Sequence, residues 1–592
     1  MSDSIIRWAS TGGGWRSMIA CMGFGNLFHQ IGLLPPLANS SSSSSAVPFS
    51  ISTVSGSSWY ALQLFYSHQF YDSTVSVSPN DLRDFVYVLW DTYGDFIASS
   101  SKNTTLKEKD LCAKITNNLN DQTICQVVLL AYGGDWSAFI DQMLYEASVA
   151  YGDAAFNTRV ADQSGKLKAV EHMNLIVQSA VCPTARSNGA NTADITYAGP
   201  NNDPFNEMYT PIIPAAYDVD SGAWWFGAGD GNDGKVFTVS SPPPNTTYQL
   251  GDWDDYYLDP SKGGEGELLI PSSSNNRVLA SSPVTPLRAP FDSKTSVIQA
   301  ASATSAYLGI YSPIVPSTFA QQSTYYLNLL QAKNDGGNSS LTAPPSAANE
   351  LYNADAIYNL AMCSQWPNLC EGKSDYLYFI DGGYQDPTGL AYTIGQYQST
   401  AEANLDLTFK VILTNTNSQS FDNYYRQNIM QHFSTPFNAN IEPGDFFWDP
   451  VIAAVPTRSF QIFEDYMNAT MLNAQIEEIE GSNVTTALLS GTTIDNQAYQ
   501  VRQGQKVEML IINTNADIPT MIASSTMIDE YKVPLGDMAV DIATNTVLKD
   551  RVKAFLEEDT TKPQPPTTSS LGNMVDVHRI AFVAIVLLMY VL

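Results

Sequence analysis

Short apolar segments of strand-like composition alternate along this chain with stretches in which apolar residues recur at helical spacing. This alternation constrains the fold most strongly, because strands that alternate with helices favour a mostly parallel sheet covered on both faces. The expected strands are residues 5–9, 49–54, 174–177, 376–380, 409–413 and 507–512. Helical patterns follow the first two strands directly. The sequence therefore predicts an α/β fold with a mostly parallel central sheet, helices on both faces and large loop or lid insertions.

The domain organisation is predicted from shifts in composition along the 592 residues. Residues 1–555 contain all the expected strands and are predicted to form one catalytic α/β body. Residues 185–295 are rich in Asn, Asp, Gly and Pro, which predicts long loops that form a lid or cap. Residues 556–579 are rich in Pro, Ser and Thr and indicate a linker.

Aromatic residues of the expected lid are candidates for lining an apolar groove or resting on an apolar surface, and packing within the lid is the alternative. They are Trp224, Trp225, Phe226, Trp253, Tyr256 and Tyr257.

Residues 580–592 form an uncharged apolar tail. It is short for a bilayer-spanning helix but has the length of a GPI-signal tail, and a plain membrane anchor is the alternative. The N-terminal residues lack the apolar core of a signal peptide, so a GPI signal would require a start upstream of Met1. We expect the chain to associate with a membrane through this tail, at the cell surface if the tail is a GPI signal. Glycosylation sequons stand at Asn39, Asn103, Asn245, Asn338, Asn468 and Asn483.

The charge balance limits the partners of this chain. With 29 Lys+Arg against 59 Asp+Glu, the net charge is −30 and no basic run occurs. A nucleic-acid partner is therefore not expected. The six cysteines include no CxxC pair, and no EF-hand or HExxH motif occurs, so neither a metal nor a cofactor is indicated. The cysteines fit either free buried thiols or two small disulfide loops, Cys112–Cys125 and Cys363–Cys370. Oligomeric state is not indicated.

A glycine run separates the first expected strand from the first expected helix. Gly12, Gly13 and Gly14 let the backbone approach a ligand closely, and amides at a helix start can hold an anion. Arg16 adds a fixed positive charge. An ordinary tight turn is the alternative interpretation.

Ser55 stands where the second expected strand turns into a helix, flanked by small residues. That position exposes a hydroxyl at a helix N-terminus, as in a nucleophile elbow. The alternative is a serine that merely caps the helix.

Asp381 follows the apolar strand 376–380 and precedes two glycines. A carboxylate at a strand end is well placed to act as a base, because ligands bind beyond the carboxyl ends of parallel strands. A simple Asp-Gly turn is the alternative.

Together these segments resemble the patatin-like and cytosolic phospholipase A2 superfamily, and within it the fungal phospholipase B (lysophospholipase) branch. The segments are 10–18 (STGGGWRSM), similar to SGGGxRAM, 55–59 (SGSSW), similar to SGGSW, and 380–383 (IDGG), similar to VDGG. Weaker similarity covers 207–211 (EMYTP) and 301–305 (ASATS). Thr53 and Ser57 stand where the family has glycine.

The resemblance implies a phospholipase or lysophospholipase with a Ser–Asp dyad. Ser55 would attack the ester carbonyl and Asp381 would accept its proton. The amides of Gly13 and Gly14 would form the oxyanion hole, and Arg16 would hold the lipid phosphate. A phospholipid or lysophospholipid in a membrane surface would then be the partner.

Two alternatives stay open at this stage. The order Ser55, Asp381, His432 is also that of an α/β-hydrolase triad, although His432 lies in a segment that reads as helix. A catalytically inactive, membrane-attached binding protein is the second, because Thr53 and Ser57 depart from the family pattern.

Overall fold

The structure is a computed structural model. It describes residues 4–37, 49–100, 140, 143–144, 166–182, 213–219, 223–226, 257–258, 268–269, 297–305, 378–384, 386–398, 403–417, 429–430, 432–433, 461–465, 467–496, 499, 501–519 and 525–557. The predicted linker beyond residue 557, the apolar tail, four of the six sequons and both candidate cysteine pairs lie outside these residues.

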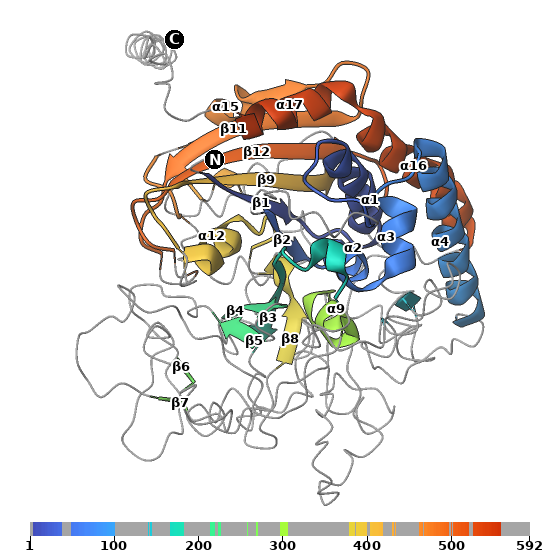
Figure 1. The fold of residues 1–592 in the computed structure, drawn as a ribbon, viewed down its shortest axis with the longest axis horizontal. Coiled ribbons are helices and arrows are strands. Elements are labelled where there is room, and N and C mark those ends of the chain that lie inside the picture. The colour runs from blue at the N-terminus through green and yellow to red at the C-terminus, as the bar shows by residue number, and fades with distance from the viewer. Residues whose placement is uncertain are drawn as a thin grey trace, which may run out of the picture.

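A ten-stranded sheet dominates the described part of the chain, with the order β10-β11-β12-β9-β1-β2-β3-β4-β5 and β8 paired to β3 (Figure 1). Its centre is parallel and consists of β12 (Lys506–Asn515), β9 (Thr408–Asn417), β1 (Ser4–Ser10), β2 (Phe49–Val54) and β3 (Leu175–Cys182). Antiparallel strands extend it: β10 (Ile476–Glu478), β11 (Val484–Thr492), β4 (Ile213–Asp218), β5 (Ala223–Phe226) and β8 (Tyr378–Asp381).

All six strands expected from the sequence are present, and the parallel centre confirms the predicted fold class. The flanking strands β4, β5, β10 and β11 were not predicted. Two of them, β4 and β5, lie in the segment predicted to be loops, as does the small pair β6 (Tyr257–Leu258) and β7 (Leu268–Leu269). Trp224 and Trp225 therefore belong to an edge strand rather than a loop, in keeping with the preference of aromatic residues for strands.

Helices surround this sheet. They are α1 (Gly14–Gln30), α2 (Gly56–Tyr66), α3 (His68–Thr74), α4 (Pro79–Ser100), α9 (Val297–Ser305), α12 (Leu390–Gln398), α15 (Ala469–Asn473), α16 (Ser525–Thr544) and α17 (Thr546–Glu557), with short 3-10 turns at Lys168–Val170 and Gly382–Tyr384. Within the described residues, none of these helices is long and apolar enough to cross a membrane.

Neighbouring residues of β1 show that both faces of the sheet are covered. Trp8 is fully buried and packs edge-on against Phe28 of α1, with ring centroids 4.8 Å apart. Ala9 points to the opposite face, because side chains alternate along a strand, and joins the apolar cluster that includes Leu390 of α12. In Figure 1, α1, α4 and α16 lie together, and α12 lies apart from them beside β9.

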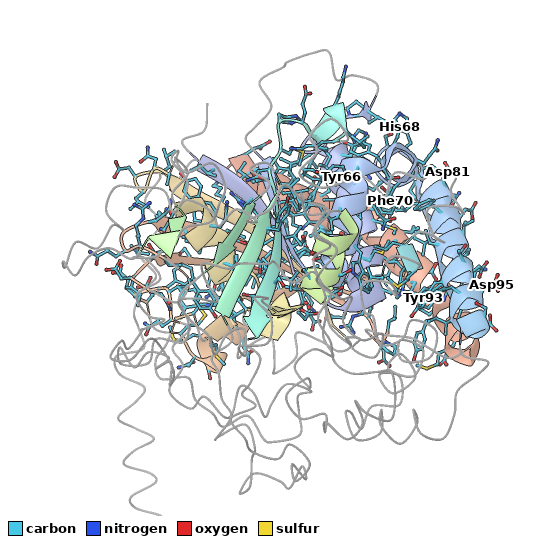
Figure 2. The ribbon with its side chains drawn as sticks, turned by 90° about the horizontal axis from the view of Figure 1, so that it is seen from below. Tyr66, His68, Phe70, Asp81, Tyr93 and Asp95 are labelled. Carbon is cyan, nitrogen blue, oxygen red and sulfur yellow. The ribbon has the colours of Figure 1, made fainter. Side chains whose placement is uncertain are left out.

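Helix α4 illustrates how the sequence specifies these outer elements. Ser78 and Asp81 bond reciprocally at its start: the Asp81 amide donates to Ser78 Oγ (3.3 Å), and Ser78 Oγ donates to the Asp81 carboxylate (2.6 Å). Pro79 fits the first helical position, because its missing N–H would have no partner there. Figure 2 shows Asp81 and Asp95 on the outer side of α4, whereas Tyr93 is turned inward and packs against Trp15. The apolar face therefore joins the core and the acidic face meets solvent.

Candidate active site

Ser55 occupies the sharp turn between β2 and α2. Its backbone angles are φ 55° and ψ −126°, and it is the sole non-glycine residue with positive φ in the described part of the chain. A non-glycine residue costs about 1–3 kcal/mol in such a conformation and persists only when its surroundings enforce it. Although Ser55 is at the N-cap position, its side chain makes no capping hydrogen bond. The capping interpretation is therefore wrong, and the hydroxyl is available for another partner.

That partner is Asp381. The Ser55 side chain lies within hydrogen-bonding reach of the Asp381 carboxyl group, and the Gly383 amide donates to Asp381 Oδ1 at 2.8 Å. Asp381 is only 7% exposed. Burial raises its pKa from 3.8 to about 6, against the opposing effect of Ser55 and of the Gly383 amide, which both lower it. The carboxylate is thus ionised at neutral pH and remains basic enough to take a proton from the hydroxyl.

The strand pairing explains why these two residues meet. Strand β3 pairs along one edge with β4, and along its other edge first with β2 and then with β8. Val54, the last residue of β2, is opposite Gln178, whereas Asp381, the last residue of β8, is opposite Ser179. Because β2 is parallel to β3 and β8 is antiparallel to it, the carboxyl ends of β2 and β8 meet head to head. The sequence predicted a strand-end aspartate but not this reversed direction.

Ser57 and Thr53 stand where the phospholipase family has glycine, and both make hydrogen bonds in the turn around Ser55. The hydroxyl of Ser57 accepts from the Val54 amide (3.0 Å) and lies 2.9 Å from the Ser10 carbonyl oxygen, so it ties the turn to β1. Thr53 Oγ1 accepts from Ser58 Oγ at 2.9 Å. Both residues are buried and stabilise the turn, so their presence does not argue against an active site.

The glycine run lies directly against the serine turn. A Cβ at Gly12 would stand 2.9 Å from Ser55 Cβ, which real Cβ contacts essentially never allow. Gly13 (φ 137°) is the N-cap of α1 and Gly14 (φ 55°) is its first residue, and both angles favour glycine. The first amides of a helix have no partner within the helix. The two predicted oxyanion-hole residues thus start a helix beside the nucleophile candidate.

Arg16 lies in the first turn of α1 and is 6% exposed. Its Nη1 donates to the Ile518 carbonyl oxygen (2.6 Å), beyond the end of β12. Its Nη2 lies 3.7 Å from the position that a Cβ on Gly13 would take. The guanidinium is therefore anchored on one side and lies beside the glycine run on the other.

His432 has different partners. Its Nε2 lies 3.1 Å from Thr388 Oγ1 and 3.7 Å from Asp386 Oδ1, and all three residues are buried. Of the segment expected to be helical, residues 429 and 430 are helical, whereas residues 432 and 433 form a turn. A Ser–His–Asp triad places the imidazole between the serine and the acid, whereas here the Ser55 side chain lies within reach of Asp381 and His432 contacts Thr388 and Asp386. The geometry favours the dyad over the triad.

Thr304 is the contact that motif analysis missed. Its hydroxyl accepts a hydrogen bond from the Ser55 amide at 2.8 Å. It lies in the segment 301–305, which showed only weak similarity to the phospholipase family. No local pattern indicates which buried hydroxyl will meet a distant turn, so only the packing of α9 reveals it.

No protein-family model and no curated protein matches the chain. The solved structure of human GIVD cytosolic phospholipase A2 is similar at a TM-score of 0.33 and 11% identity, with 94% of this chain and 63% of that chain covered. The chain thus spans less than two thirds of that protein.

Proposed function

We propose that the chain is a serine acyl hydrolase that cleaves carboxylic ester bonds of phospholipids or lysophospholipids through a Ser55–Asp381 dyad. The observation that carries this proposal is the approach of the Ser55 side chain to the buried Asp381 carboxyl group, close enough to lower the pKa of that group. A serine hydroxyl is a weak nucleophile until an adjacent base accepts its proton. The strained turn at Ser55 adds support, because such strain concentrates at functional sites.

In the acylation step, Ser55 Oγ attacks the ester carbonyl carbon while its proton passes to Asp381. The negative charge that develops on the carbonyl oxygen is stabilised by N–H donors at the start of α1, for which Gly13 and Gly14 are the candidates. Collapse of this intermediate breaks the bond to the alcohol, which leaves with the proton from Asp381. The product is an acyl ester on Ser55.

In the deacylation step, Asp381 accepts a proton from water, and the resulting hydroxide attacks the acyl ester. The fatty acid leaves and the proton returns to Ser55. One carboxylate thus acts as base and acid in both halves of the reaction, which suits a group whose pKa of about 6 lies close to neutral pH.

The phospholipid substrate class derives from the motif resemblance together with Arg16. A guanidinium suits the lipid phosphate because it is always charged and presents several N–H donors. Arg16 uses Nη1 to hold the Ile518 carbonyl, and the Nη2 side is the one that lies near the glycine run. We further propose that the apolar tail at residues 580–592 attaches the enzyme to the membrane that holds its substrate.

Fatty-acid release from phosphatidylcholine and lysophosphatidylcholine tests the proposal, with no calcium added. We expect the wild type to release fatty acid, and Ser55→Ala and Asp381→Asn each to lose at least about 10³-fold in kcat. Matched controls are Ser99→Ala and Asp95→Asn, because both residues are exposed on α4. Neither control should change the rate.

His432→Ala separates the dyad from the triad. Retained kcat in this variant, at unchanged secondary structure, supports the dyad. Loss comparable to that of Ser55→Ala would instead establish a histidine-dependent hydrolase. If the wild type releases no fatty acid and does not react with a fluorophosphonate probe, the enzyme proposal fails and an inactive binding protein becomes the better reading.

A further inference from the structure

Thr304 stands near the end of α9 and is completely buried. Its single hydroxyl has three neighbours from three other elements. It accepts from the Ser55 amide at 2.8 Å, donates to the Gln178 carbonyl oxygen of β3, and lies 3.2 Å from Ser58 Oγ in α2. One hydroxyl thus joins the serine turn to the strand beside it.

The bond to Ser55 is made by the backbone of the residue under strain. At the end of β2 the chain leaves the sheet, so the Ser55 amide needs a partner from outside the ladder. Thr304 supplies it while Ser55 holds its positive φ. A buried amide without such a partner would relax toward one, and the Ser55 side chain would move with it.

The hydrogen bond to Gln178 connects Thr304 to β3, the strand that pairs with Asp381. Gln178 is opposite the end of β2, and the next residue, Ser179, is opposite Asp381. Ser179 Oγ also donates to the Ala303 carbonyl oxygen at 2.8 Å, so the end of α9 is bonded to β3 at two successive residues. The position of α9 is therefore fixed relative to β3, the strand whose pairing with β8 places Asp381.

We infer that Thr304 is a positioning residue that holds the Ser55 backbone in register with Asp381, an inference that rests on the proposed function. Thr304 does not touch the reacting atoms in this arrangement. It acts through the amide of Ser55 and through β3. Its contribution is to the geometry between nucleophile and base, on which the rate depends steeply because small displacements from the reactive arrangement are costly.

The hydroxyl, rather than the shape of the side chain, is what this role requires. Valine has nearly the shape of threonine but can neither accept from Ser55 nor donate to Gln178. Serine retains both functions and lacks only the methyl group. Ser305 is a matched control, because it is the next residue of α9, is also buried, and bonds within its own helix to the Ala301 carbonyl oxygen at 2.7 Å.

The first experiment measures the rate at which a fluorophosphonate probe labels Ser55 and the kcat and KM of ester hydrolysis. We expect Thr304→Val to lower the labelling rate and kcat by about 10- to 100-fold with KM changed less than about threefold. Thr304→Ser should keep the rate within about threefold of the wild type, and Ser305→Ala should leave it unchanged. If Thr304→Ser is as slow as Thr304→Val, or if Thr304→Val keeps the full rate, the inference is overturned.

The second experiment is independent of activity. Amide hydrogen exchange, read in peptides that cover residues 53–58, should show slow exchange at Ser55 in the wild type and in Thr304→Ser. In Thr304→Val the same amide should exchange at least about tenfold faster, with the core strands β1 and β9 unchanged. Unaltered protection of Ser55 in Thr304→Val rejects the positioning role whether or not the chain is an enzyme. If the exchange pattern is as expected but the chain hydrolyses no ester, the proposed function is rejected while the positioning role of Thr304 is retained.

Discussion

Gly56, the first residue of α2, lies so close to Gly14, the first residue of α1, that a Cβ at position 56 would be 2.0 Å from the Gly14 carbonyl oxygen. The starts of two helices thus touch through backbone alone. Because Ser55 precedes Gly56 and the glycine run precedes α1, this contact brings the nucleophile candidate and the oxyanion-hole candidates together.

Gly56→Ala should therefore disrupt the site. The methyl group would meet the backbone of Gly14, which has no flexible end to move aside, so the two helix starts must separate. We expect hydrolysis to fall by at least about 10²-fold and the free energy of unfolding to fall by about 1–3 kcal/mol. Gly481→Ala is the control, because Gly481 has positive φ but open space around its Cβ position. It should lose about 1–2 kcal/mol at most and no activity.

Hydrolysis should depend on the ionisation of Asp381. Its pKa is raised to about 6 by burial, and only the ionised carboxylate accepts the proton of Ser55. We expect kcat/KM to rise with pH through about 6 and then to level off. The measurement is kcat/KM between pH 4.5 and 8.5 on a soluble short-chain ester. A rate that is constant from pH 5 to pH 8 would contradict this assignment.

Asp381→Asn should stabilise the fold at neutral pH while it abolishes activity. The folded pKa of about 6 exceeds the ordinary value of 3.8, so between these values the folded protein binds more protons than the unfolded chain. Stability contributed by the neutral carboxyl is thus present below about pH 3.8 and is lost as pH rises through 6. An amide avoids this loss, so at pH 7 we expect a gain of up to about 3 kcal/mol, reduced by weaker hydrogen bonds.

Thermal unfolding at pH 4.5 and pH 7.5 checks this expectation. The difference in melting temperature between Asp381→Asn and the wild type should be clearly larger at pH 7.5. Asp95→Asn, on the exposed face of α4, serves as the control with little expected change. An Asp381→Asn protein that is less stable than the wild type at pH 7.5 would show that the carboxylate stabilises the native state instead.

Asp386 stabilises the loop that follows Asp381, and its role is structural rather than chemical. Its carboxylate accepts from the amides of Thr388, Gly389 and Ala391 at 2.9–3.1 Å, and so caps the start of α12. Asp386→Ala leaves these buried amides without that acceptor. We expect a loss of at least about 2 kcal/mol in the free energy of unfolding.

Urea denaturation measures this loss, and Asp406→Ala, at an exposed turn, is the matched control. At a temperature where Asp386→Ala is still folded, its pH profile should keep the midpoint near that of the wild type. A shifted or absent midpoint would assign Asp386 a part in proton transfer.

Much of the fold could be predicted from short windows of sequence. The strands β1, β2, β9 and β12 are rich in apolar residues, and buried parallel strands have this composition for a physical reason: both of their faces are covered. The strands β4 and β11 were missed because their segments do not stand out as apolar runs and become strands through their pairing. The segment of β11, VTTALLSGT, mixes apolar and polar residues and becomes a strand through its pairing with β12.

By itself, the sequence determined the local chemistry: a glycine run before a helix, a serine at a strand-to-helix turn and an aspartate at a strand end. Only the tertiary structure decided that Ser55 and Asp381 meet, because the direction and register of β8 against β3 are set by non-local pairing. An apolar run is compatible with either direction, so it carries no record of its partner. The same holds for Thr304 and His432, two buried side chains whose partners were chosen by packing rather than by any pattern around them.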